Sequence, residues 1–109
     1  MLLLTGLTFS RSFALEQLKA ARALGIRTAA CIMSWDHLSS KALLHLPPHR
    51  TLVWNPVQKA EATGMHGLDP TQVIVTGAQC YDQWFDRQPS RDRAAFCRRV
   101  GLPDDGRYL

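Results

Sequence analysis

A run of polar side chains follows the apolar residues 31–33 and carries most of the chemistry that this sequence offers. Asp36 is the candidate catalytic base, because a carboxylate beside Trp35 is expected to lose part of its hydration, which would raise its pKa. His37 is the second catalytic candidate, since an imidazole moves protons near neutral pH. The plainer alternatives are that Asp36 caps the following turn and that His37 is a surface residue.

Polar residues of this loop and of two later loops are predicted to bind substrate. The first loop offers donors, acceptors, both charges and a titratable ring. Gly6 and Gly77 each follow an expected strand, where glycine lets a ligand approach backbone N–H groups, although a tight turn is the alternative. Asn55 precedes Pro56, which is also a strong helix start. The substrate-binding candidates are Ser34, Trp35, Lys41, Asn55, Thr76, Gly77 and Gln79.

No metal or cofactor site is expected. The chain has neither a G-x-G-x-x-G nor a G-x-x-x-x-G-K-[ST] pattern, so dinucleotide and P-loop phosphate sites of those kinds are unsupported. His45 and His49 would suit a metal on a helix, but Pro47 and Pro48 lie between them and forbid that helix.

The composition fits one small cytoplasmic domain. The chain has 109 residues, 46% of them hydrophobic, and a formal net charge of +4. Arginines near the C-terminus alternate with aspartates, which favours a solvated mixed-charge helix over a nucleic-acid stripe. The sequence shows neither a membrane span nor a signal peptide. Cys31, Cys80 and Cys97 are odd in number and widely spaced, which indicates reduced thiols.

Four apolar runs alternate with helical patterns along the chain. Strands are expected at residues 2–4, 27–33, 51–54 and 73–75, and helices starting at Ser12, Asn55 and Ser90. This alternation predicts a parallel sheet with right-handed crossovers and a ligand site beyond the carboxyl ends of the strands. Residues 27–33 lack clean alternation, as expected of a strand covered on both faces. Four strands with few helices are nevertheless expected to leave the sheet poorly covered, with a bare edge.

Three segments together resemble a region of GT-B-fold glycosyltransferase-like proteins: SWDHLSSK, HRTLVWNPVQKAEATGMHGLDPTQVIVTGAQCYDQWF and PSRDRAAFCRRVGL. The proteins that it resembles are bacterial proteins related to CDP-glycerol glycerophosphotransferases and UDP-N-acetylglucosamine 2-epimerases. The resemblance covers nearly the whole chain. It implies an α/β fold with a Rossmann-like parallel β-sheet and flanking helices, as part of a GT-B N-terminal domain. Residues 1–86 would form this half-domain, and residues 87–109 a linker helix leading toward an absent C-terminal domain.

The same resemblance implies roles for the loop residues. Asp36 lies where related enzymes keep a catalytic base, and the family pattern has Asn at the position of His37. Thr76, Gly77 and Gln79 match a second loop facing the interdomain cleft. The chain would be a fragment of a glycosyltransferase-type enzyme that transfers a nucleotide-activated sugar or glycerol phosphate to a cell-envelope acceptor.

The partners implied by the resemblance belong to the full-length parent. They are a nucleotide-activated sugar or polyol donor and a glycan acceptor, with a peripheral membrane contact as a further partner. No cofactor and no nucleic acid are expected, and the chain alone is expected to be inactive.

The alternative is a non-enzymatic α/β interaction module that self-associates, as a homo-oligomer, or binds a partner. It would use its bare sheet face and an aromatic patch, Tyr81, Trp84 and Phe85, which have the spacing of one helix face. Core or interdomain packing of these rings is favoured over sugar stacking. A flavodoxin-like nucleotide binder is a third interpretation, but this chain has Thr5 and Gly6 where that fold has an acidic cluster.

Overall fold

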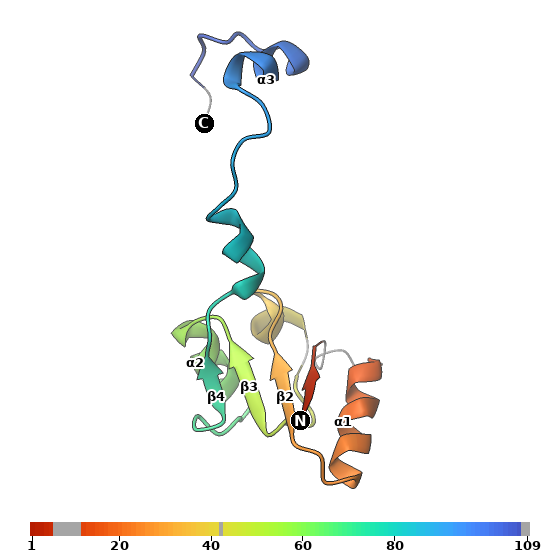
Figure 1. Ribbon diagram of the computed structural model, residues 1–109. Coiled ribbons are helices and arrows are strands. Elements are labelled where there is room, and N and C mark those ends of the chain that lie inside the picture. Colours follow the sequence, from red (N-terminus) through yellow and green to blue (C-terminus); the bar gives the residue numbers. More distant parts are fainter. Residues whose placement is uncertain (6–11, 42, 108–109) are drawn as a thin grey trace.

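The computed structural model describes residues 1–5, 12–41 and 43–107 and confirms the expected alternation of strands and helices (Figure 1). Gly6, which was predicted to follow the first strand, and residues 7–11 lie outside these described residues. In chain order the elements are β1 (Leu2–Leu4), α1 (Phe13–Ala23), β2 (Thr28–Cys31), the π-helical turn η1 (His37–Lys41), β3 (Arg50–Val53), α2 (Pro56–Gly64), β4 (Val73–Val75), the 3₁₀ helix η2 (Gln79–Trp84) and α3 (Arg93–Val100).

Side-chain caps start the first two helices where the sequence predicted. The Ser12 hydroxyl accepts a hydrogen bond from the Leu15 N–H at the start of α1. Asn55 accepts one from the Gln58 N–H at the start of α2, where Pro56 is the first helical residue.

The third helix begins later than the sequence indicated, and the prediction of Ser90 as its cap is wrong. The Asp92 carboxylate caps α3, because its Oδ1 accepts the Ala95 N–H at 2.7 Å. A negative charge there also complements the positive end of the helix dipole. Gly101 ends α3 with a φ of 73°, a conformation that suits glycine.

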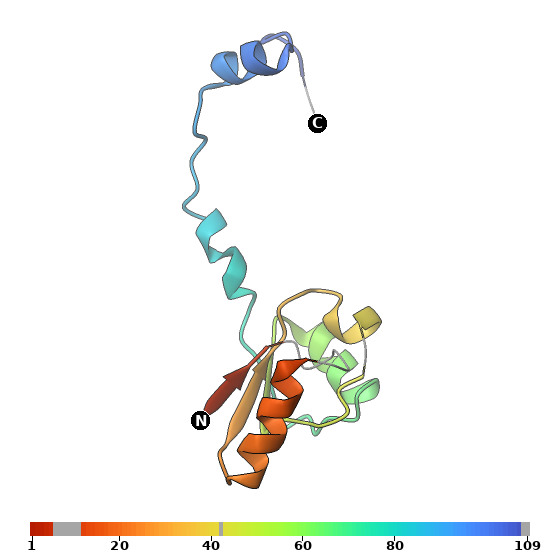
Figure 2. The ribbon, with the colours of Figure 1, turned by 90° about the vertical axis from the view of Figure 1, so that its right-hand side faces the viewer.

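The four strands are parallel and lie in chain order, β1-β2-β3-β4. Every crossover therefore moves in the same direction, and right-handed crossovers must then all pass over one face of the sheet. Figure 2 shows this arrangement, with α1, η1 and α2 on one side of the strands. The fold is thus an α/β, Rossmann-like arrangement with a four-stranded, all-parallel sheet and flanking helices.

The core lies between the sheet and these helices. Leu18 of α1, Ala62 of α2 and Val53 of β3 have no exposed surface, and Leu38 of η1 belongs to the same cluster. Burying a large aliphatic side chain contributes about 1.5–3 kcal/mol, so this covered face supplies most of the stability of the sheet.

The opposite face of the sheet carries apolar side chains, and none of the helices in the described residues covers it. Leu3 pairs with Ala29, Cys31 with Leu52, and Leu52 with Ile74, so alternate residues of each strand point away from the core. Leu3 is 56% exposed and Ile74 is 42% exposed. Thr28, Ala29 and Ala30 are all buried, so the middle of the predicted strand 27–33 is covered on both faces, whereas Met33 at its end is 52% exposed. The expected poorly covered sheet is confirmed by the strands on either side. We call this surface the open face.

The C-terminal part of the described chain extends away from the sheet. Figures 1 and 2 show η2 beyond the carboxyl end of β4 and α3 at the far end of the molecule. The radius of gyration is 19.8 Å, against about 13 Å for a compact domain of this length. A division at residue 86 into half-domain and linker stays a prediction. Within residues 1–5, 12–41 and 43–107, no helix is long and apolar enough to cross a membrane.

Candidate functional site

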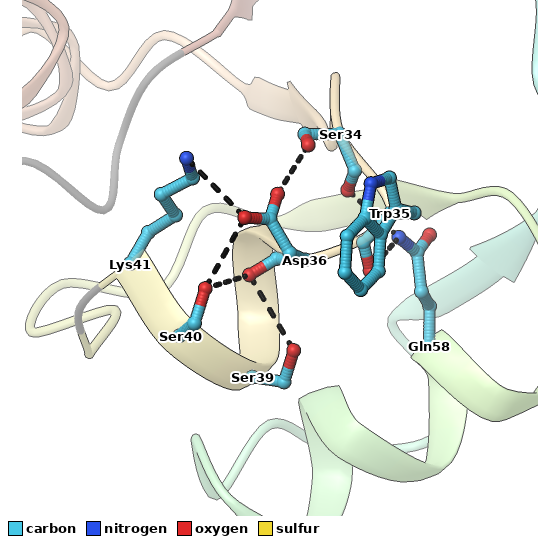
Figure 3. A network of polar contacts seen from close by, with 7 residues as sticks. All are labelled: Ser34, Trp35, Asp36, Ser39, Ser40, Lys41 and Gln58. Atoms are coloured by element: carbon cyan, nitrogen blue, oxygen red, sulfur yellow. Dashed lines mark hydrogen bonds and ion pairs between the residues drawn. The ribbon is translucent and has the colours of Figure 1, made fainter.

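The Asp36 carboxylate lies just beyond the carboxyl end of β2 and is held by its neighbours along the chain (Figure 3). The Ser34 hydroxyl donates a short hydrogen bond to Oδ1. The Ser40 hydroxyl donates to Oδ2 at 3.3 Å, and Lys41 Nζ forms an ion pair with the same oxygen at 3.3 Å. Ser40 also donates to the Asp36 carbonyl at 3.0 Å, which ties the carboxylate to the turn of η1.

These partners stabilise the charged form of Asp36. The hydrogen bond from Ser34 does most to hold its pKa below the ordinary value of 3.8, helped by the hydrogen bond and charge of Lys41, while burial acts in the opposite direction. The predicted rise in pKa is therefore wrong. Trp35 is 73% exposed and does not shield the carboxylate from water. Asp36 is an anion at neutral pH, suited to accepting hydrogen bonds from hydroxyl groups.

His37 is buried, so the interpretation of a surface histidine is wrong. It is the first residue of η1, and only 6% of its surface is exposed. Desolvation lowers its pKa from 6.5, an effect that the charge of Asp36 opposes and the charge of Lys41 assists. This shift favours the neutral imidazole, and a catalytic role for His37 stays a prediction.

Gln58 is a positioning residue that the sequence analysis missed. It lies in the first turn of α2 and is 2% exposed. Its Oε1 accepts the Trp54 N–H at 2.8 Å, while its Nε2 donates to the carbonyls of Ser34 at 2.9 Å and Trp35 at 3.3 Å. Figure 3 shows this amide beneath the loop. A glutamine three residues after an Asn cap was the available signal, since that position commonly bonds back to the preceding backbone.

The second loop lies at the same edge of the sheet but in a different pocket. Thr76, Gly77 and Gln79 line a pocket of about 60 Å³ with residues from β2 and β3, and Asp36 is not among its lining residues. The Thr76 N–H donates to the Val53 carbonyl at 2.8 Å, which continues the sheet to this point. Gly77 has a φ of 87°, as a turn after a strand requires.

Asn55 is occupied as a helix cap. Its side-chain oxygen accepts the Gln58 N–H at 2.9 Å, so the oxygen predicted to bind substrate already stabilises the start of α2. The site residues thus divide into an Asp36 loop, formed by Ser34, Trp35, Asp36, His37 and Lys41, and a Gly77 loop, formed by Thr76, Gly77 and Gln79.

The three rings of the aromatic patch do not pack in the core. Tyr81 makes an edge-to-face contact with Trp54, with ring centroids 5.5 Å apart and planes at 87°. The Arg87 guanidinium lies 4.3 Å from the centroid of the Trp84 ring. Phe85 is 87% exposed. Core packing of the patch is therefore wrong, and interdomain packing stays a prediction.

A wide hollow of the described chain lies in the C-terminal segment, away from both loops. It has a volume of about 670 Å³, is wide open to solvent, and is lined by residues 88–93 and Phe96 of the C-terminal segment. No carboxylate of the Asp36 loop and no strand end reaches it, so we attach no chemistry to it.

Two histidines outside the Asp36 loop, His49 and His66, bind backbone N–H groups. His49 Nδ1 lies 3.1 Å from the Thr28 N–H that donates to it, and His66 Nδ1 accepts the Leu44 N–H at 3.0 Å. Among the residues with described positions, no three His, Cys, Asp or Glu side chains gather as a metal site. Cys31, Cys80 and Cys97 are free thiols.

The chain matches no protein-family model, and comparisons with curated proteins and with solved structures found no significant match. What is shown about its class is therefore the fold: a parallel four-stranded α/β sheet with helices on one face.

Proposed function

We propose that this chain is the acceptor-side α/β unit of a glycosyltransferase-type enzyme, which transfers a nucleotide-activated sugar or glycerol phosphate to a cell-envelope acceptor. The observation that carries the proposal is the anionic Asp36, held by Ser34, Ser40 and Lys41 at the carboxyl end of a parallel strand. Such edges are where parallel sheets bind ligands. The resemblance of three segments to GT-B-fold proteins supports the same assignment.

In this proposal Asp36 orients the acceptor hydroxyl and takes its proton as the bond to the donor forms. Its side chain is 21% exposed, so a hydroxyl group can reach it. A carboxylate with a lowered pKa is a weak base before the reaction begins, so orientation is its larger contribution. Neutralising the leaving diphosphate is assigned to a C-terminal domain, and the chain alone is not expected to turn over substrate.

A binding experiment on the isolated chain tests the proposal. Amide chemical shifts are followed by NMR during titration with polyol-phosphate and glycan acceptors, and separately with CDP- and UDP-linked donors. We expect acceptor binding to shift residues of the Asp36 loop and to be lost in Asp36→Ala. Asp69→Ala is the matched control, because Asp69 also has a lowered pKa, caused by hydrogen bonds from Thr71, but precedes β4 at the opposite edge.

Two results would overturn this assignment. Saturable binding of a nucleotide-linked donor to the monomeric chain would contradict the placement of the donor site on another domain. Acceptor shifts that are as large in Asp36→Ala as in the unmodified chain would show that the carboxylate does not hold the acceptor.

A second function is favoured by the open face and its surroundings: self-association as an interaction module. The chain exposes 7926 Å², whereas a compact protein of 12.2 kDa exposes about 6,100 Å². This surplus of about 1,800 Å² per chain exceeds the roughly 800 Å² that each partner contributes to a standard protein interface. It includes exposed apolar side chains of the sheet, such as Leu3 and Ile74, together with Phe85 of the aromatic patch.

Light scattering distinguishes this function from the first. Self-association predicts a mass above 12.2 kDa that falls to the monomer value in Ile74→Lys, which puts a charge on the open face. Val57→Lys is the control, because Val57 is 66% exposed on α2, which covers the other face. A chain that is monomeric at all concentrations contradicts self-association and leaves the acceptor proposal intact.

A further inference from the structure

Three sulfur-bearing residues from two parts of the sequence line one small pocket on the open face. The chain has six sulfur-bearing residues, three Cys and three Met. Half of them, Cys31, Met33 and Cys80, are among the nine residues that line the 60 Å³ pocket beside the Gly77 loop. A random distribution would place fewer than one sulfur there, so this gathering calls for a specific explanation.

The fold explains how these sulfurs meet. Cys31 and Met33 are two residues apart in extended chain, which places both side chains on the same face. The Ile32 N–H still bonds to the Leu52 carbonyl at 3.0 Å, so the strand geometry continues past Cys31. Cys80 comes from η2, which stands beyond the carboxyl end of β4 (Figure 1).

The walls of the pocket are suited to a soft ion. Leu52 and Trp54 supply apolar surface, and the contact of Trp54 with Tyr81 fixes η2 against this end of the sheet. No imidazole or carboxylate is among the lining residues. Hard cations need oxygen ligands, and Zn²⁺ prefers four ligands from Cys, His, Asp or Glu. A site with two thiols and one thioether leaves both kinds of ion short of ligands.

We propose that this pocket binds one Cu(I) ion through Cys31 Sγ, Cys80 Sγ and Met33 Sδ. Thiolate and thioether sulfurs are soft ligands that suit Cu(I), which accepts fewer ligands than the four that Zn²⁺ prefers. Both thiols lose their protons to solvent as the two metal–sulfur bonds form, and the thioether donates a lone pair without a proton change. No electron is transferred, so the step needs no oxidant. The proposal is independent of the acceptor assignment, because Asp36 does not line this pocket.

The test is an anaerobic titration of the reduced full chain with Cu(I) in competition with a chromogenic Cu(I) chelator. We expect one ion per chain and release of about two protons per ion. Removing a hydrogen-bond partner of a metal ligand weakens metal affinity about ten- to a hundredfold. Cys80→Ser removes a ligand itself, so it should weaken Cu(I) affinity by about a hundredfold or more. Met33→Leu should weaken it less, since two thiolates remain.

The chain contains a matched control for thiol content. Cys97→Ser removes a buried thiol of α3, which does not line the pocket, and should leave Cu(I) affinity unchanged. Cys80 is exposed, so Cys80→Ser should fold normally, and circular dichroism checks this directly. The proposal is overturned if Cys80→Ser binds as tightly as the unmodified chain, if Cys97→Ser weakens binding equally, or if Zn²⁺ binds with comparable affinity.

Discussion

Replacing Gln58 with methionine should destabilise the fold and release the Asp36 loop from the end of β3. Methionine keeps the length of the side chain but removes both polar groups of the amide. The Trp54 N–H then loses the acceptor at 2.8 Å, and an unpaired, partly buried donor costs about 1–3 kcal/mol. The carbonyl of Ser34 keeps the His37 N–H at 3.3 Å, and Trp35 is exposed to water, so these two losses add only about 1 kcal/mol.

The free energy of unfolding should therefore fall by about 3 kcal/mol in Gln58→Met, which corresponds to a drop in Tm of roughly 15 °C. Urea unfolding followed by tryptophan fluorescence measures it, and hydrogen exchange of the Trp54 amide should accelerate. Gln17→Met is the matched control, because Gln17 is an exposed residue of α1 and the same substitution there should change stability by less than about 0.5 kcal/mol. If both variants unfold at the same urea concentration, the amide of Gln58 does not hold the loop.

Three further predictions concern the loop residues. Asp36 has a folded pKa below 3.8, so it stabilises the fold above that pH, and Asp36→Asn should flatten the loss of stability measured by urea unfolding as pH falls from 5 to 2. His37 has a folded pKa below 6.5, so the unfolded chain binds its proton first; stability should fall as pH drops below 6.5, and less steeply in His37→Gln. Gly77→Ala should destabilise by about 1 kcal/mol through its φ of 87° alone, since a Cβ there meets nothing within 4 Å, whereas Gly64→Ala in α2 should stabilise.

The strands and helices were predictable because local chemistry decides them. The caps at Ser12 and Asn55 act as their residue types suggest, and the strand runs are short and apolar. The prediction that Ser90 caps α3 was wrong because Ser90 and Asp92 are both good capping residues and lie close together in the sequence. Only the folded chain shows that Asp92 accepts the N–H of the first helical turn. The lack of alternation in TAAC matches the burial of Thr28, Ala29 and Ala30 on both faces of β2, because small side chains need little cover.

The candidate site was predictable in position but not in electrostatics. A loop after a parallel strand identifies the place, and Asp36 and Lys41 do lie together. The direction of a pKa shift depends on which groups come within hydrogen-bond distance, and nothing in the order of residues tells that Ser34 turns back to Asp36. The burial of His37 likewise depends on the packing of the π-helical turn that contains it, which the order of residues does not reveal.

The order of the strands also separates the two loops in a way that constrains any ligand. Since all crossovers pass over one face, η1 folds onto the covered side, and Gln58 of α2 bonds to the Ser34 and Trp35 carbonyls that precede it. Cys80 of η2 instead shares a pocket with Cys31 and Leu52, whose side chains lie on the open face. Both loops follow parallel strands at the same edge of the sheet, but the Asp36 loop packs on the covered face and the Gly77 loop borders a pocket on the open face. A hydroxyl ligand at Asp36 and a Cu(I) ion at Cys80 should therefore bind independently, each with the same affinity in the presence of the other. A change in either affinity would mean that the edge of the sheet couples the two faces, and the division into two sites would then be wrong.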